Sequence, residues 1–84
     1  GEDKVASISV RQHVRIKCPD SPICVFNNQM GTVVGFTNDR TQINVRPDSA
    51  PTDRLLSLFP RELRDTNPFR EAPAEIQARI PEFN

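Results

Sequence analysis

The 84-residue sequence contains no tryptophan, no tyrosine, one histidine, two cysteines and only three glycines. Without tryptophan or tyrosine, the hydrophobic core has to be built from valine, isoleucine, leucine and the five phenylalanines. The same absence disfavours an aromatic cage for methyl-lysine, because such a cage depends on cation–π contacts with aromatic rings. A chain of this length supplies one domain, near the lower limit at which burial of apolar surface stabilises a fold.

The sequence also lacks an excess of charge of either sign, because eleven Lys or Arg residues balance eleven Asp or Glu residues. Net charge alone therefore predicts no polyanionic partner. The distribution is uneven, since residues 4–64 carry nine basic and five acidic residues, a net charge of +4. Residues 1–3 and residues 65–84 each carry a net charge of −2. We expect a mildly basic body with acidic ends.

Long apolar runs are absent, and no segment approaches the ~20 residues that a membrane-spanning helix needs. No positively charged start leads into an apolar stretch, as a secretory signal requires. Two cysteines, Cys18 and Cys24, are too few for a disulfide framework, which favours a reducing compartment. We expect no membrane association and an intracellular location, either cytoplasmic or in an organelle if a targeting segment has been removed.

The clearest structural signal is a strand over residues 31–36, Gly-Thr-Val-Val-Gly-Phe. This β-branched apolar run begins at a glycine and ends at a polar turn over residues 37–40. Residues 10–17 and 41–46 alternate between apolar and polar side chains, as half-buried strands do. The pattern predicts that these two segments pair with residues 31–36 on either side.

Alternation over residues 10–17 separates an apolar face from a basic face. The apolar face carries Val10, Val14 and Ile16, with Gln12 as its one polar member. The basic face carries Arg11, His13, Arg15 and Lys17.

The order of motifs along the chain resembles that of the SH3-like barrel group. The motifs are Val-Arg-Ile-Lys at residues 14–17, Gly-Thr-Val-Val-Gly at residues 31–35, Val45-Arg46 and Pro-Arg-Glu-Leu at residues 60–63. KOW-type domains of transcription and ribosomal proteins, Tudor-like readers and small barrel subunits of photosynthetic electron transport share this order. The sequence over roughly residues 12–64 is most similar to the photosystem I subunit IV type of barrel subunit. The similar segments are Val14-Arg15-Ile16, Pro19-Asp20-Ser21, Gly31-Thr32-Val33-Val34 and Val45-Arg46.

The resemblance implies an all-β fold, a five-stranded SH3-like barrel over residues 8–64. Residues 1–7 are expected to be a flexible N-terminus. Residues 65–84 form a C-terminal extension with at most one short helix, because Ile76 and Ile80 lie four residues apart on one weak helical face. This face either packs on the barrel or meets a partner.

The basic residues are the main candidates for a functional site. The predicted partner-binding surface consists of Arg11, His13, Arg15, Lys17, Arg40 and Arg46. Such a cluster attracts an acidic protein surface through complementary potential, or binds the phosphates of nucleic acid. A solvated strand face that prevents edge-to-edge aggregation has the same composition. We expect a non-catalytic interaction module or small accessory subunit, a monomer in isolation, that docks an acidic protein partner. The alternative is a KOW-like module contacting RNA or a nucleoprotein complex.

Catalysis and metal binding find little support in the sequence. Cys18, Cys24 and His13 are three potential zinc ligands, whereas a structural zinc site uses four. His13 is also the one imidazole that could activate a cysteine nucleophile. No phosphate-binding loop or dinucleotide fingerprint is present. We expect no metal, no cofactor and no enzymatic activity, and we favour two thiols over a disulfide between the cysteines.

Overall fold

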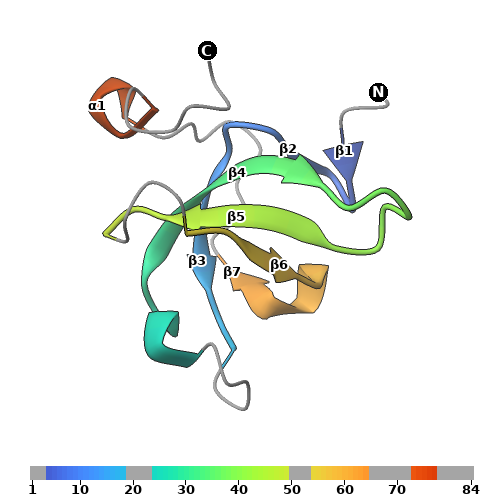
Figure 1. The fold of residues 1–84 in the computed structure, drawn as a ribbon, viewed down its shortest axis with the longest axis horizontal. Helices are drawn as coiled ribbons and strands as arrows, with labels where there is room; N and C mark the ends of the chain where they lie inside the picture. Colours follow the sequence, from blue (N-terminus) through green and yellow to red (C-terminus); the bar gives the residue numbers. More distant parts are fainter. Residues whose placement is uncertain (1–3, 19–23, 50–53, 65–72, 78–84) are drawn as a thin grey trace.

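The computed structural model describes residues 4–18, 24–49, 54–64 and 73–77. These residues form short strands, two 3₁₀ turns and one short helix (Figure 1). In chain order they are β1 (Lys4–Val5), β2 (Ile8–Ser9), β3 (His13–Ile16), η1 (Cys24–Phe26), β4 (Met30–Phe36), β5 (Ile43–Pro47), β6 (Leu56–Leu58), η2 (Pro60–Glu62), β7 (Leu63–Arg64) and α1 (Ala74–Gln77). The predicted all-β fold, with at most one short helix in the extension, is confirmed for the described residues.

Five strands form one antiparallel sheet in the order β6-β5-β4-β3-β7. The sheet curls into a half-barrel, with β4 and β5 crossing its middle (Figure 1). The central strand β4 pairs with β3 on one side and β5 on the other, so both predicted pairings are confirmed. The last strand, β7, returns to pair with β3, the first strand of the sheet.

The chain passes from β6 to β7 through the single turn η2. Pro60 is the first residue of η2, where its fixed φ suits the start of a helical turn. The carboxylate of Glu62 accepts a hydrogen bond from the backbone N–H of Phe59 at 2.8 Å. Leu63 then enters the core, and the N–H of Lys17 donates to the carbonyl of Glu62 at 2.7 Å. The turn thereby aligns β7 with β3.

The core lies on the inner face of the curled sheet. Its most deeply buried apolar side chains are Val14, Ile16, Val33, Ile43, Val45 and Leu58. Each fully buried side chain of this kind contributes about 1.5–3 kcal/mol relative to an exposed one. Val5, Phe26 and Phe36 pack against this cluster and are partly buried.

Gly31 sits where β4 approaches β5 too closely for a side chain. A Cβ atom on Gly31 would lie 2.6 Å from Cγ1 of Val45 and 3.1 Å from the carbonyl oxygen of Arg46. Both distances are shorter than the ~3.5–4.0 Å of a normal carbon contact. The glycine before Thr-Val-Val therefore permits a close backbone approach.

Residues 4–9 form a feature that the sequence did not predict. Lys4 pairs with Ser9 and Val5 with Ile8, which makes a two-stranded hairpin. Its turn residues, Ala6 and Ser7, have φ angles of 51° and 66°. A type I′ turn needs positive φ at both central positions and usually has Asn or Gly there. The turn thus has no typical sequence signal, and the pattern of residues did not predict the hairpin.

The first strand of the sheet begins later than predicted. Arg11 has a φ of 77°, so the alternation expected over residues 10–17 starts only after it. Val10 is 36% exposed rather than part of the core. Gln12 is 2% exposed, and its Oε1 accepts a hydrogen bond from the N–H of Ser9 at 3.0 Å. Gln12, the polar member of the apolar face, can be buried because its side chain accepts the hydrogen bond of a backbone N–H in the preceding turn.

Candidate functional site

The outer face of the sheet carries a row of side chains that crosses four segments of the chain. Cross-strand pairing places Arg15 of β3 between Arg64 of β7 and Met30 of β4. The N–H of Asp48, directly after β5, donates to the carbonyl of Met30 at 3.0 Å. We call Arg64, Arg15, Met30 and Asp48 the transverse row. It runs from two cations through an apolar side chain to a carboxylate.

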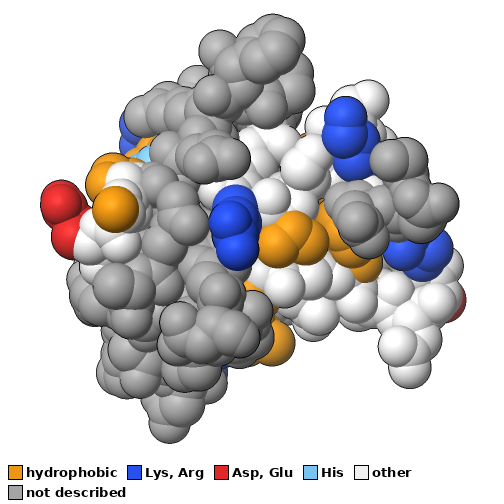
Figure 2. Space-filling model, turned by 90° about the horizontal axis from the view of Figure 1, so that it is seen from above, with side chains coloured by type: hydrophobic (Ala, Val, Ile, Leu, Met, Phe, Trp, Pro, Cys, Tyr) orange, Lys and Arg blue, Asp and Glu red, His pale blue; other side chains and the backbone are white. Residues whose placement is uncertain are grey.

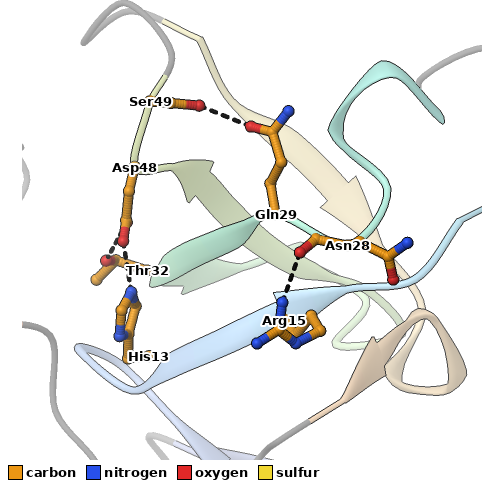
Figure 3. Close-up of polar contacts among 7 residues, drawn as sticks. All are labelled: His13, Arg15, Asn28, Gln29, Thr32, Asp48 and Ser49. Atoms are coloured by element: carbon orange, nitrogen blue, oxygen red, sulfur yellow. Dashed lines mark hydrogen bonds and ion pairs between the residues drawn. The ribbon is translucent and has the colours of Figure 1, made fainter.

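At the acidic end of the transverse row, Asp48 forms a polar cluster with His13 and Thr32 (Figure 3). Nε2 of His13 hydrogen-bonds with Oδ2 of Asp48, and the Thr32 hydroxyl donates to Oδ1 at 3.1 Å. The side chains of His13 and Asp48 are 12% and 19% exposed, and Thr32 is buried. Because the Thr32 hydroxyl donates to the carboxylate and not to the imidazole, the cluster lacks the nucleophile–base arrangement of a catalytic triad. It fastens β3 and β4 to the segment after β5.

Arg15 and Lys17 lie together because both donate to Asn28. Nη1 of Arg15 donates to the Asn28 backbone carbonyl at 2.6 Å (Figure 3), and Nζ of Lys17 donates to Oδ1 of Asn28 at 2.7 Å. Asn28 has a φ of 73°, in the left-handed region that Asn adopts more readily than most residues. The turn before β4 therefore holds Arg15 of β3 and Lys17, the residue directly after β3, next to each other.

The other predicted site residues do not join this pair. Nη2 of Arg40 donates to the carbonyl of Lys4 at 2.7 Å, so Arg40 is held against the N-terminal hairpin. Arg46 is 5% exposed, and its Nη1 donates to the carbonyl of Arg54 at 2.9 Å. Arg11 is exposed but precedes β3 in the left-handed turn. Arg46 is thus not exposed beside Arg15 and Lys17, because it is buried and bound to the carbonyl of Arg54.

Arg64 belongs to the candidate site and was missed by the sequence reasoning. It is exposed and directly opposite Arg15 in the β3–β7 pairing. Its outward direction follows from Leu63 facing the core, but its neighbour is 49 positions away in the chain. On the face shown in Figure 2, the Lys and Arg side chains lie apart from one another, with hydrophobic and uncharged side chains among them. Arg15, Lys17 and Arg64 together are called the docking surface below.

A shallow depression of about 350 Å³ opens at the acidic end of the transverse row. It is lined by Gln29, Met30, Asp48 and Ser49. The Ser49 hydroxyl donates to Oε1 of Gln29 at 2.6 Å, which joins the two rims (Figure 3). The sequence gives no local sign of the contact between Asp48 and His13, because the two residues are 35 positions apart in the chain.

Three of the predictions from the sequence concern the cysteines, metal binding and membrane association. Cys18 is buried, whereas the side chain of Cys24 lies outside the described residues. No group of three or more His, Cys, Asp or Glu side chains within residues 4–18, 24–49, 54–64 and 73–77 is placed to hold a metal ion. In the same part of the chain no helix has the length and apolarity to cross a bilayer.

Comparison of the chain with protein-family models, with curated proteins and with solved structures yields no match in any of the three.

Proposed function

We propose that this chain is a non-catalytic interaction module of the SH3-like barrel type, which docks an acidic segment of a partner protein on Arg15, Lys17 and Arg64. The observation that carries the proposal is the direct pairing of Arg15 with Arg64 across β3 and β7. Directly opposite residues have Cβ atoms about 4.5–5.5 Å apart, and like charges at that separation repel each other. A carboxylate of a partner can accept hydrogen bonds from both guanidinium groups.

The barrel type is supported by the connectivity of the sheet. The strands follow one another along the chain in the same order as the motifs that resemble SH3-like barrels. The chain then turns through η2 before β7 pairs with β3. This return of the last strand to the first leaves an outer face on which β3 and β7 are neighbours. The docking surface depends on the pairing of β3 with β7, because its two arginines come from these two strands.

The contacts of Arg15 and Lys17 with Asn28 support a binding role as well. A cation that is already held in place loses less side-chain entropy when a partner binds. Arginine can also receive a carboxylate through two parallel hydrogen bonds, which fixes the orientation of the partner. Each exposed ion pair contributes only about 0.2–1 kcal/mol, so we expect weak, salt-sensitive docking.

A protein partner fits the face better than nucleic acid does. The transverse row contains no aromatic ring on which a base could stack, and the imidazole of His13, in the neighbouring row, is only 12% exposed and hydrogen-bonds with Asp48. Asp48, at one end of the transverse row, repels phosphates. The KOW-like alternative therefore enters as an outcome of the test.

The test measures binding of a fluorescent twelve-residue glutamate peptide by anisotropy at low and moderate salt. Arg15→Glu combined with Arg64→Glu is expected to weaken binding at least about tenfold, since two attractive contacts become repulsive. Arg40→Glu combined with Arg61→Glu is the matched control, with the same change of net charge on two exposed arginines outside the docking surface. Its affinity should stay within about twofold of the parent protein.

Equal weakening in both double variants would mean that net charge alone governs binding, and would contradict the proposal. Binding of a mixed oligonucleotide pool, with no binding of the glutamate peptide, would replace it by the KOW-like alternative. No binding of either probe at low salt would identify the basic side chains as a solvated strand face.

A further inference from the structure

The transverse row has an order of charges, and this order adds a direction to the proposed docking. Arg64 and Arg15 are cationic, Met30 is apolar and Asp48 is anionic. We propose, on the basis of the proposed function, that the row selects a partner segment with an acidic residue, an apolar residue and a lysine or arginine in matching order. The acidic residue lies over the two arginines, and the cation lies at Asp48.

The spacing of the row suits an extended segment that crosses the strands. Neighbouring strands are about 4.8 Å apart, so the three intervals from Arg64 to Asp48 span about 14 Å. Alternate side chains of an extended peptide lie on one side, and residues i and i+4 are about 13 Å apart. The matching pattern is therefore acidic, any residue, apolar, any residue, Lys or Arg. The apolar residue at i+2 then falls over the middle of the row, near Met30.

The depression at the end of the row provides the place for the cation. Each carboxylate oxygen of Asp48 has one hydrogen bond, from Thr32 or with His13. A carboxylate has about four acceptor positions, so Asp48 can accept a further N–H donor. The aliphatic part of a Lys or Arg side chain packs on Met30, whose thioether adapts to irregular shapes. Because Asp48 is 19% exposed, this ion pair is less screened by solvent than one on the open surface.

The mixed charge of the row distinguishes this partner from a simple polyanion. A continuous run of carboxylates or phosphates gains contacts at Arg64 and Arg15 but meets repulsion at Asp48. A segment with a cation four residues from its acidic residue satisfies both ends. Complementary potential of this kind fixes the register of a partner more than it raises raw affinity.

The test compares two peptides, Ser-Glu-Ser-Leu-Ser-Lys-Ser and its counterpart with glutamine in place of lysine, by NMR titration of the labelled protein. The parent protein should bind the lysine peptide about fivefold more tightly, as expected for one partly shielded ion pair. In Asp48→Asn, which removes the charge and keeps one acceptor oxygen, the preference should fall below about twofold.

Ser49→Lys provides a second variant that leaves both hydrogen bonds of Asp48 in place. Its new cation on the rim of the depression should also remove the preference for the lysine peptide. Amide spectra of both variants show whether the fold is retained, and Ser49→Lys decides the question if Asp48→Asn unfolds.

Two results would overturn this inference without touching the proposed function. One is equal affinity of the parent protein for both peptides, with loss of both in the Arg15→Glu and Arg64→Glu variant. The other is a lysine preference that persists in the variants of Asp48 and Ser49. Failure of both peptides and of the glutamate peptide to bind the parent protein would overturn the docking proposal itself.

Discussion

Replacement of Gly31 by alanine tests the packing between β4 and β5. The added Cβ would lie 2.6 Å from Cγ1 of Val45, 3.1 Å from the carbonyl oxygen of Arg46 and 3.4 Å from Cδ1 of Ile16. A normal carbon contact is about 3.5–4.0 Å, so Val45 would have to move by about 1 Å. Val45 and Ile16 are fully buried and the third atom is backbone, so little room for relaxation exists.

Overpacking of this kind costs typically about 1–3 kcal/mol. Alanine also restricts the unfolded chain, which returns about 0.4–1 kcal/mol where the native backbone accepts it. Gly31 has no positive φ, so this gain applies and the net loss should be about 1–2 kcal/mol. For a domain of this size, such a loss lowers Tm by about 4–15 °C. Urea unfolding at equilibrium gives the free energy directly.

Gly35→Ala is the matched control in the same strand. Its Cβ would meet only Nδ2 of Asn44 at 3.9 Å, an ordinary contact. The free energy of unfolding should be unchanged or rise by up to about 1 kcal/mol. If Gly31→Ala is as stable as Gly35→Ala, the close approach of β4 to β5 does not hold, and the reasoning is refuted.

Two further predictions concern carboxylates just beyond the ends of β4 and β5. Asp48→Ala should lower the free energy of unfolding by about 1–3 kcal/mol, because the buried Thr32 hydroxyl loses its acceptor; an unchanged urea midpoint would contradict the assigned contact. The hydroxyl of Thr37, and then that of Thr41, holds the pKa of Asp39 below its ordinary value. Because the pKa of Asp39 is lower in the folded state, its ionised carboxyl stabilises the fold. This contribution to stability is complete above the ordinary pKa and is lost as pH falls through the folded-state pKa. NMR titration of the Asp39 carboxyl should show this low pKa, and Thr37→Val should raise it; no change in Thr37→Val would refute the cause.

The sequence predicted the central part of the fold because the deciding interactions there are local. The alternation over residues 41–46 agrees with the burial of Ile43 and Val45, and the apolar run that begins at a glycine identified β4. The hairpin of residues 4–9 was missed, since Ala6 and Ser7 are unusual in a turn with two positive φ angles. Local pattern cannot reveal a turn that tertiary structure imposes on such residues.

The candidate site was harder to predict because its contacts connect distant parts of the chain. Arg15 was named correctly as an outward cation, but Arg64 becomes its neighbour only when β7 closes on β3. Arg46 was included in the predicted partner-binding surface, yet its guanidinium is buried and bound to the carbonyl of Arg54. A strand pattern gives the face of a residue and not what covers that face.

The proposed docking is tested most directly by mapping amide shifts of the labelled protein during titration with the glutamate peptide at low salt. The account predicts shifts at Arg15, Lys17 and Arg64 that diminish as salt is added, with little change at Arg40 and Arg61. Shifts that gather at Arg40 and Arg61, or that spread evenly over all basic residues, would contradict the assignment of Arg15, Lys17 and Arg64 as the docking surface.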